Sequence, residues 1–544
     1  MGNLTKYCTI IIFVFSASIG FSQTVNWDWS RGAGGSGDDV GYSIKTDNEN
    51  NIIIVGTFSN NALFGNNFIN SISIYGGAFV AKLDSSGNFI WARRIVGTHF
   101  TSVYSVATDL FNNIYVSGSF AESTNIESAA LVSNGSSDLF IAKYNENGDF
   151  LWAKSYGGHG IDGATSLICS DSLLFVAGEF RDSVYFDTTQ LISSGNSDIF
   201  LACLDFEGNY QWIKQAGGLY YDVSRSISID NNSDVIIAGH INTSANFGVT
   251  DTTVFTYGSA DPFVAKYSPD GNFLWVNSFG GMDGDRGISV IPDIDNNIFL
   301  HGHFYGTASF DAITLQSTGV NDYFICKLNP NGDVVWANKI ETTIDPYDDF
   351  WNHTLESDEQ GNVYITGWFR DSLVYNDLTV QSNGSYDIFV MKIDNDGDLI
   401  WCLTAGNDHS YGDYSRSITR DNNGNLFITG RFYDTLCFGD SCVTSNGSAD
   451  IFIAKISETP LNIEFVKETM QIDIFPNPAS SFLNIISDDN EIQEVEIIDN
   501  NGKCISGYKD SDMSHIDVSD LSKGMYFVRV IYRNITITRK IIII

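Results

Sequence analysis

The chain has 544 residues, of which 17% are charged, 13% are aromatic and 50 are glycine, and its formal net charge is −37 at pH 7. This acidic balance repels phosphate backbones and anionic lipid, which argues against nucleic-acid binding. Many glycines and aromatic residues with few charges are typical of short β-strands joined by polar turns.

Residues 1–22 have the features of a signal peptide. Lys6 precedes an apolar run over about residues 7–21, which is too short to span a bilayer as a helix. Small residues precede Gln23, so we expect cleavage between Ser22 and Gln23. No later stretch is apolar over the length of a membrane helix. We therefore expect an exported mature chain without a transmembrane segment.

Three columns of residues recur about every 62 positions from residue 24 onward. The first column is Trp29, Trp91, Trp152, Trp212, Trp275, Trp336 and Trp401. The second is Phe79, Phe140, Phe200, Phe263, Phe324, Phe389 and Phe452, mostly within the pattern Phe-x-Ala-Lys. The third is Gly56, Gly118, Gly178, Gly239, Gly302, Gly367 and Gly430. Seven occurrences of each column indicate seven copies of one structural unit.

Each copy is predicted to hold four β-strands, which in the second copy cover residues 104–109, 113–120, 139–144 and 150–155. Turns of the form Asp-x-x-Gly-Asn separate strands and place Gly where a hairpin needs a positive φ. Self-similarity at this period indicates a β-propeller or a solenoid. We expect the Phe and Trp columns to fill the contacts between copies.

The two ends of the repeat are complementary. Residues 24–33 carry a Trp segment with no Phe-x-Ala-Lys before it, and residues 450–456 carry that pattern with no Trp after it. The N-terminal strand is therefore expected to complete the last copy. The prediction is an all-β chain with a seven-bladed β-propeller over residues 24–463. These repeats resemble the bacterial β-propeller repeat of the SBBP type, a family that implies no settled activity.

A new pattern begins near residue 465 and continues to residue 544. It contains FPNPAS, IIDNNGK and IDVSDLSKGMYFVRV in that order and ends in KIIII, as alternating strands of a small β-sandwich would. This tail resembles the C-terminal sorting domain (type A) of the type IX secretion system of Bacteroidota. The resemblance implies recognition by the outer-membrane secretion machinery, followed by release or attachment at the cell surface. An ordinary accessory sandwich is the alternative.

Seven cysteines follow the signal segment, with no CxxC pair or spacing typical of a metal site. Most stand at apolar strand positions, where Cys behaves as a small hydrophobic residue. Cys437 and Cys442 lie across a short loop, so a disulfide and two free thiols are equally open there, and an oxidising compartment permits the bond.

Aspartate forms two further columns in the repeats. One is Asp138, Asp198, Asp261, Asp322, Asp387 and Asp450, two residues before the Phe column, and the other is Asp39, Asp162, Asp222, Asp285 and Asp413, with Asp349 one residue out of register. A residue present in almost every unit is expected to serve the unit, and Asp can accept hydrogen bonds from backbone N–H groups of a loop. Bound Ca²⁺ is the alternative, although no loop matches the EF-hand pattern.

Positions that differ among the copies are better candidates for binding. The residues one and three places after each repeat Gly are small in the first two copies and aromatic or charged in the others. The binding candidates there are Glu179, Arg181, His240, His303, Tyr305, Trp368, Arg370, Arg431 and Tyr433. Trp, Tyr and Arg dominate binding hot spots, and aromatic rings stack on sugars. Variable, solvent-exposed strand ends are the alternative interpretation.

An enzyme has little support in the sequence. No Gly-x-Ser-x-Gly elbow, HExxH motif or phosphate loop occurs, and His301-x-His303 lacks a third ligand at metal-site spacing. We expect a non-catalytic cell-surface module for adhesion, glycan binding or protein scaffolding, with no cofactor. An extracellular glycosidase or lyase is the alternative, because a propeller can build a site from distant loops.

Overall fold

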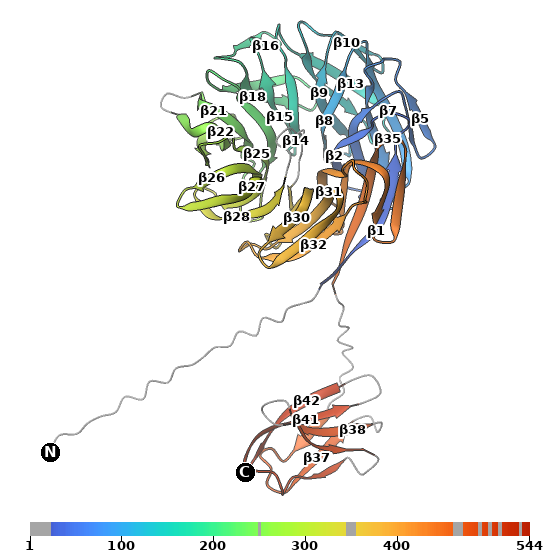
Figure 1. Ribbon diagram of the computed structural model, residues 1–544, viewed down its shortest axis with the longest axis vertical. Helices are drawn as coiled ribbons and strands as arrows, with labels where there is room; N and C mark the ends of the chain where they lie inside the picture. The colour runs from blue at the N-terminus through green and yellow to red at the C-terminus, as the bar shows by residue number, and fades with distance from the viewer. Residues whose placement is uncertain are drawn as a thin grey trace, which may run out of the picture. The chain divides into compact units, whose positions relative to one another are not determined.

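The computed structural model describes residues 23–248, 252–343, 355–460, 472–487, 492–498, 503–509, 514–531 and 536–544. Every regular element in these ranges is a β-strand (Figure 1). The chain divides into two compact parts, Met1–Pro460 and Leu461–Ile544, which we call the repeat domain and the tail domain. The predicted signal segment, the predicted boundary between residues 463 and 465, and Asp349 all lie outside the described residues.

Each sequence repeat forms a four-stranded antiparallel unit, whose strands run in chain order from the innermost to the outermost. Unit 1 contains β2 (Val40–Thr46), β3 (Ile52–Phe58), β6 (Gly77–Leu83) and β7 (Phe89–Gly97), and unit 2 contains β8 (Thr101–Thr108), β9 (Ile114–Phe120), β12 (Asp138–Tyr144) and β13 (Phe150–Tyr156). Unit 3 contains β14 (Gly163–Cys169), β15 (Leu173–Phe180), β18 (Asp198–Asp205) and β19 (Tyr210–Ala216), and unit 4 contains β20 (Val223–Ile229), β21 (Val235–Asn246), β22 (Thr253–Tyr267) and β23 (Phe273–Ser278). Unit 5 contains β25 (Arg286–Pro292), β26 (Ile298–Phe310), β27 (Ile313–Leu328) and β28 (Val334–Thr343), and unit 6 contains β29 (Leu355–Ser357), β30 (Val363–Tyr375), β31 (Leu378–Ile393) and β32 (Leu399–Ala405).

The seventh unit joins the two ends of the repeat domain. It contains β33 (Tyr414–Arg420), β34 (Leu426–Phe438), β35 (Ser441–Pro460) and, as its outermost strand, β1 (Gln23–Ala33). Trp29 of β1 lies opposite Lys455 of β35, and Gly32 lies opposite Phe452. In Figure 1 the blue β1 lies beside the orange β35. The prediction that the N-terminal strand completes the last unit is confirmed.

The innermost strands contact one another in a cycle, which we call the inner ring. The order is β2, β8, β14, β20, β25, β29 and β33, and β33 contacts β2 again. Serines on these strands accept hydrogen bonds from backbone N–H groups of the neighbouring unit. Ser105 Oγ accepts the N–H of Leu167 (3.2 Å), and Ser417 Oγ accepts that of Ile44 (3.3 Å). A cavity of about 70 Å³ at the axis is lined by residues of all seven strands.

Small hairpins beyond the four predicted strands link neighbouring units. The hairpins are β4 (Asn61–Phe64) with β5 (Asn67–Asn70), β10 (Ser123–Ile126) with β11 (Ala129–Val132), and β16 (Ser183–Phe186) with β17 (Thr189–Ile192). In units 4 to 7 the second and third strands are long enough to form the same extension. The end of the preceding unit pairs with this hairpin or extension. Gly97 of β7 in unit 1 pairs with Thr124 of β10, and β24 (Gly280–Gly281), which follows unit 4, pairs with β26 of unit 5.

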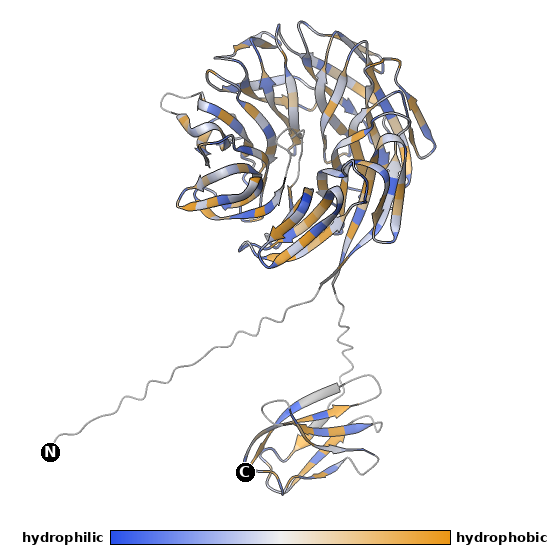
Figure 2. Ribbon diagram, viewed as in Figure 1, coloured by the Kyte–Doolittle hydropathy of each residue, from blue (hydrophilic) through white to orange (hydrophobic). Residues whose placement is uncertain are grey.

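The core lies between the units, where the Phe column is 0% exposed at all seven positions. Hydrophobic clusters draw residues from adjacent units; one of them joins Val80 and Trp91 of unit 1 to Val116 and Phe140 of unit 2. Third strands such as β6 and β12 are buried at every position, so both of their faces are packed, since successive residues point to opposite faces. Figure 2 shows hydrophobic residues, in orange, along the strands of the repeat domain. The expected role of the Phe column is therefore confirmed, whereas most residues of the Trp column stay half-buried.

In four units, the lysine three residues after the column Phe is buried in an ion pair. Lys82 Nζ lies 2.9 Å from Asp47 Oδ2, and Lys266 Nζ lies 2.6 Å from Asp230 Oδ2. Lys327 with Asp293 and Lys392 with Asp358 repeat the arrangement at 3.3 and 3.1 Å. In each pair the aspartate begins the turn between the first and second strands, so the ion pair fixes that turn against the third strand.

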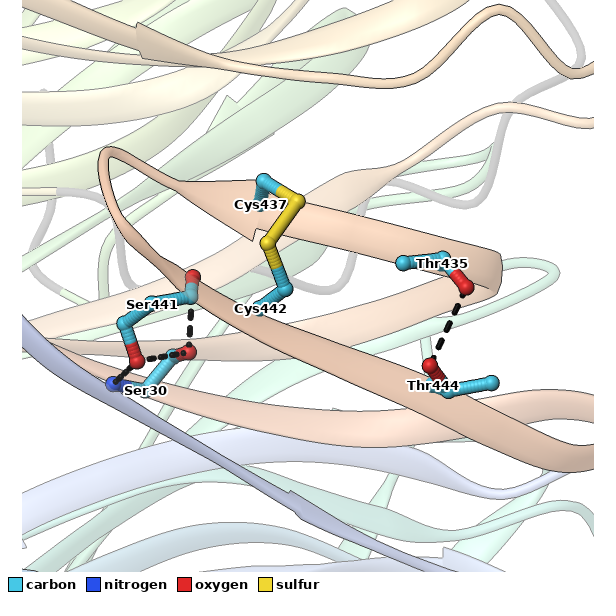
Figure 3. Close-up of a disulfide and its surroundings, with 6 residues drawn as sticks. All are labelled: Ser30, Thr435, Cys437, Ser441, Cys442 and Thr444. Carbon is cyan, nitrogen blue, oxygen red and sulfur yellow. Dashed lines mark hydrogen bonds between the residues drawn. A yellow bond between two sulfur atoms is a disulfide. The ribbon is translucent and has the colours of Figure 1, made fainter.

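A disulfide joins Cys437 and Cys442 across the turn between β34 and β35 (Figure 3). Beside it, Ser30 of β1 donates its backbone N–H to Ser441 Oγ at 2.9 Å. The disulfide and this hydrogen bond therefore reinforce the unit in which the two ends of the repeat domain meet.

The tail domain is a pair of antiparallel sheets on one core. One sheet contains β36 (Ile472–Phe475), β37 (Phe482–Ser487) and β40 (His515–Asp517), and the other contains β38 (Glu494–Ile498), β39 (Cys504–Tyr508), β41 (Gly524–Ile531) and β42 (Thr536–Ile543). Leu483 and Ile516 from the first sheet pack with Val495 and Val528 from the second. Ile541 and Ile543 are buried as well, which explains the isoleucine run at the end of the chain.

Candidate binding face

The predicted binding positions lie at one end of the inner ring. The residue after each repeat Gly pairs with the start of an innermost strand, as His240 does with Val223, His303 with Arg286, and Arg431 with Tyr414. The innermost strands of neighbouring units run in the same direction, so their first residues lie at one end of the ring and their last residues at the other. For example, Thr108 at the end of β8 donates its hydroxyl to the Thr46 carbonyl at the end of β2. We call this the N-terminal end of the inner ring.

A second set of side chains at this end was missed in the sequence. The pairing between the first and second strands shifts by one residue in units 1 to 5 and in unit 7, which leaves one bulged residue on the innermost strand. The bulged residues are Tyr42, Tyr104, Thr165, Arg225, Ile288 and Arg416. A bulge re-aims a side chain, and bulges are frequent beside functional sites. The signal in the sequence is that each precedes a recurring Ser of the inner ring.

Units 6, 7 and 1 bring aromatic rings and guanidinium groups together at this end. The members are Tyr42, Trp368, Tyr386, Tyr414, Arg416 and Arg431, which we call the aromatic–arginine cluster. Trp368 and Tyr414 form an edge-to-face pair with ring centroids 5.5 Å apart. The Arg416 guanidinium lies 5.6 Å from the Trp368 ring and 5.8 Å from the Tyr42 ring, and Arg431 lies 4.5 Å from the Tyr414 ring. These distances suit cation–π contacts.

Two buried donor atoms of the cluster have no hydrogen-bond acceptor among the described residues. The Trp368 side chain is only 2% exposed, and its Nε1 has no hydrogen-bond partner among the described residues. The Nε atom of Arg431 is also buried and has no hydrogen-bond partner among the described residues. A buried donor without an acceptor costs free energy, so such atoms are uncommon except where a ligand or water completes them.

A stack of exposed aromatic rings adjoins the cluster. Tyr411 is 62% exposed and stacks on Tyr433 with centroids 5.1 Å apart and ring planes 27° apart, and its ring also stacks with that of His409, with centroids 5.2 Å apart. Burial raises the pKa of Tyr433, and the positive charge of Arg431 opposes that shift. The stack therefore leads from the solvent-exposed surface to the arginine of the cluster.

Units 4 and 5 hold a second group of predicted residues, His240, His303 and Tyr305. Burial holds the pKa of His240 and His303 well below the ordinary value, and the charges of Arg225 and Arg286 add to this for His240. Both imidazoles are therefore neutral at physiological pH. Burial also lowers the pKa of His301 to about 4, and its Nδ1 lies 2.9 Å from the carbonyl oxygen of Phe324. The described part of the chain contains no group of three or more His, Cys, Asp or Glu side chains that could hold a metal ion.

Three predicted residues remain, of which one lies beside the aromatic–arginine cluster and two lie in unit 3. Arg370 is exposed and lies 5.8 Å from the Tyr386 ring, so it adjoins the aromatic–arginine cluster. Glu179 and Arg181 belong to unit 3, where Arg181 lies over Tyr221 at 5.3 Å. The alternative of solvent-exposed strand ends is wrong for Trp368, His240 and His303, which are 2%, 6% and 0% exposed, because neighbouring units pack over them.

The two aspartate columns meet between neighbouring units. Asp285 accepts the N–H groups of Gly281 (2.7 Å) and Tyr305 (2.9 Å), and Asp261 accepts that of Tyr257 (2.6 Å). Both side chains are fully buried, and burial raises the pKa of each to about 7. The charge of the other aspartate raises the pKa of Asp285 further. The donors around these carboxylates are N–H groups, which favour the structural role and do not fit a Ca²⁺ site, where carbonyl oxygens would complete the shell.

Comparisons with known proteins identify the tail. Residues 473–544 match the family described as "Secretion system C-terminal sorting domain". The tail domain is a type IX sorting domain. This chain is therefore secreted to the cell surface, and the type IX secretion machinery is its partner in export. Within the described residues, no helix is long and apolar enough to cross a membrane.

The chain is also similar to two curated proteins at low sequence identity. The chain is 21% identical over 557 residues to the "Uncharacterized WD repeat-containing protein L264" of Acanthamoeba polyphaga mimivirus, an alignment that covers 83% of this chain and 40% of that protein. It is 22% identical over 426 residues to the "Regulatory protein FlaEY" of Caulobacter vibrioides, covering 72% and 43%. The chain thus spans less than half the length of the curated relatives it matches.

Two solved structures are similar over most of the chain, and both are extracellular domains of hybrid two component systems from B. thetaiotaomicron. The first is 13% identical with a TM-score of 0.21, covering 92% of this chain and 68% of that one. The second is 10% identical with a TM-score of 0.18, covering 95% and 99%.

Proposed function

We propose that the repeat domain is a seven-bladed β-propeller of the SBBP type, closed by its N-terminal strand. The cyclic order of the innermost strands and the pairing of β1 with β35 support this architecture. A relative named for WD repeats supports it too, because each WD repeat forms a four-stranded blade. We also propose that residues 1–22 are a signal peptide removed between Ser22 and Gln23, which would place the chain in the periplasm before the sorting domain acts.

At the cell surface the propeller would act as a non-catalytic module that binds a glycan or another surface protein. The aromatic–arginine cluster carries this proposal, because it places buried donors without acceptors beside exposed aromatic rings at one end of the ring. Arg, Trp and Tyr are the residues that dominate binding hot spots. Adhesion and scaffolding are the roles that such a surface supports, with the ring as a rigid platform.

An array of glycans and surface proteins, probed with residues 23–544, tests the proposed function. We expect ligands whose binding is lost in the double variant Tyr411→Ala, Tyr433→Ala. The matched control is Phe111→Ala, because Phe111 is 75% exposed but lies in the turn after β8, at the opposite end of the ring. Binding that survives the double variant for every ligand, or an array with no ligand, would refute the proposed site.

A panel of chromogenic glycosides separates binding from catalysis. A pure binding module leaves these substrates intact. Robust turnover would instead identify the protein as a glycosidase or lyase that uses the same face.

A further inference from the structure

We infer that the aromatic–arginine cluster binds an acidic saccharide, with its carboxylate on Arg431 and a sugar ring stacked on the Tyr411–Tyr433 pair. This inference rests on the proposed function and names the chemical class of its ligand. The structural juxtaposition that carries it is the exposed Tyr411 ring, stacked on Tyr433, in the same unit as the half-buried Arg431 guanidinium.

Three arginines lie in or beside the cluster in a protein whose net charge is −37. Arg416 and Arg431 belong to the cluster, and the exposed Arg370 adjoins it through Tyr386. Arg presents a planar fork of donors that matches a carboxylate in a bidentate pair. An acidic surface elsewhere on the molecule repels anions, so an anionic ligand is directed to this face.

Asp38 and Asp413 are the acidic side chains that act on Tyr433, and both are engaged by the fold. Asp38 Oδ1 accepts the N–H of Ala449 (3.3 Å). Asp413 precedes Tyr414 and is fully buried, and its Oδ1 accepts the N–H of Tyr433 (3.2 Å) and the side-chain amide of Asn407 (3.4 Å). Burial raises the pKa of Asp413 to about 7, which reduces its negative charge at neutral pH. Arg431 and Arg370 have no carboxylate of a described residue within ion-pairing distance. Their charge is therefore available to a ligand.

The aromatic side of the site is suited to a sugar. Tyr411 and Tyr433 present a nearly parallel stack, of which Tyr411 is largely exposed, and the apolar face of a sugar ring packs on such a surface. A saccharide carrying a carboxylate suits both the tyrosine stack and the guanidinium groups of Arg431 and Arg370, whereas a neutral sugar leaves these two groups without an anion.

Calorimetric titration of residues 23–544 with oligogalacturonate tests the inference. The comparison ligands are the same oligosaccharide after reduction of its carboxyl groups and a sulfated oligosaccharide of equal length. We expect binding of oligogalacturonate that weakens with added salt, and loss of binding on carboxyl reduction. Arg431→Gln is expected to reduce affinity roughly 10- to 100-fold, the range for a hydrogen bond to a charged group. Arg370→Gln is a second variant at an exposed position, with a smaller reduction expected.

Arg93→Gln is the matched control, because Arg93 also lies over an aromatic ring, that of Trp91 at 5.3 Å, but on the outermost strand of unit 1. It should leave the affinity unchanged. Equal affinity for the reduced and native oligosaccharides would overturn the inference while leaving the proposed function intact. An affinity for oligogalacturonate that is unchanged in both Arg431→Gln and Arg370→Gln would do the same. Preference for the sulfated ligand would overturn the carboxylate assignment. If the Tyr411→Ala, Tyr433→Ala variant also retains every ligand, the proposed function itself fails.

Discussion

In units 1 to 6, the glycine of the turn between the third and fourth strands lies against the tryptophan of the preceding unit. A Cβ on Gly148 would stand 2.7 Å from the Trp91 ring, and Gly148 has a φ of +76°. The same contact joins Trp29 to Gly87, Trp152 to Gly208, Trp212 to Gly271, Trp275 to Gly332, and Trp336 to Gly397. Each of these tryptophans and the turn glycine of the next unit therefore recur together, because the pair forms one contact between two units. Trp401 has no such glycine and instead donates its Nε1 to Glu458.

Gly148→Ala is expected to lower the stability of the repeat domain. The new Cβ meets the Trp91 ring and the residue must hold a left-handed backbone conformation, which together cost on the order of 1–3 kcal/mol. Gly319→Ala is the control, since nothing lies within 4 Å of a Cβ there. Thermal unfolding followed by circular dichroism measures both. Equal midpoints for the two variants would contradict the proposed contact.

The buried aspartate pairs predict how stability depends on pH. Burial raises the pKa of Asp261 and Asp285 from 3.8 to about 7. Between these values the folded state keeps protons that the unfolded state has lost, so this contribution to stability falls as pH rises from about 4 to about 7. Asp39, Asp162, Asp222 and Asp413 have pKa values raised to about 7 as well.

Urea unfolding at pH 4 to 8 measures this contribution when the protein is compared with Asp285→Asn. The variant lacks one titrating group of the pair, so its free energy of unfolding should fall less steeply between pH 4 and 7. Parallel curves for the two proteins would show that the pair does not hold a proton in the folded state.

At the scale of elements, the first-to-second-strand turn is held by a buried charge. Lys266 of β22 bridges Asp230 at 2.6 Å and Asp234 at 3.2 Å.

The sequence predicted the turns and most strands, because hairpin glycines and alternation are local signals. It did not predict the small hairpins, because strands of four residues show too little alternation to be distinguished from loops.

Lys266→Met is expected to destabilise the repeat domain by about 3–5 kcal/mol, because it leaves the Asp230 carboxylate buried without its cation. Adding Asp230→Asn should restore part of that loss. Lys339→Met is the matched control, since Lys339 pairs with Glu341 at 2.7 Å but both side chains are about 30% exposed. We expect less than about 1 kcal/mol for the control. Similar losses in urea unfolding of Lys266→Met and Lys339→Met would contradict a special role for the buried pair.

For the whole molecule, the ends of the repeat domain are joined twice. β1 pairs with β35 in unit 7, and the inner ring passes from unit 7 to unit 1 through the hydrogen bond from the Ile44 N–H to Ser417 Oγ. Without β1 the outer edge of β35 would expose unpaired backbone groups, which promote association of chains.

A chain that begins at Gly34 should therefore associate and unfold at a lower temperature than one that begins at Gln23. Light scattering and thermal unfolding measure the two effects. Removal of residues 461–544 is the control, because the tail domain is a separate compact part and its loss should leave the unfolding of the repeat domain unchanged. A monomeric chain from Gly34 with an unchanged midpoint would show that β1 does not stabilise the ring.

The sequence by itself determined the all-β class, the seven copies, the strand shared between the chain ends, and the sorting domain, because each leaves a repeated or ordered pattern of residue types. Four of the nine predicted binding residues, Trp368, Arg370, Arg431 and Tyr433, lie in or beside the aromatic–arginine cluster. Only the tertiary structure decided that Tyr42 and Arg416 join Trp368, since these residues come from three units and two of them owe their direction to bulges. A bulge depends on how two strands pair, and a contact between units depends on how the ring closes, so neither is written in any local stretch of the chain.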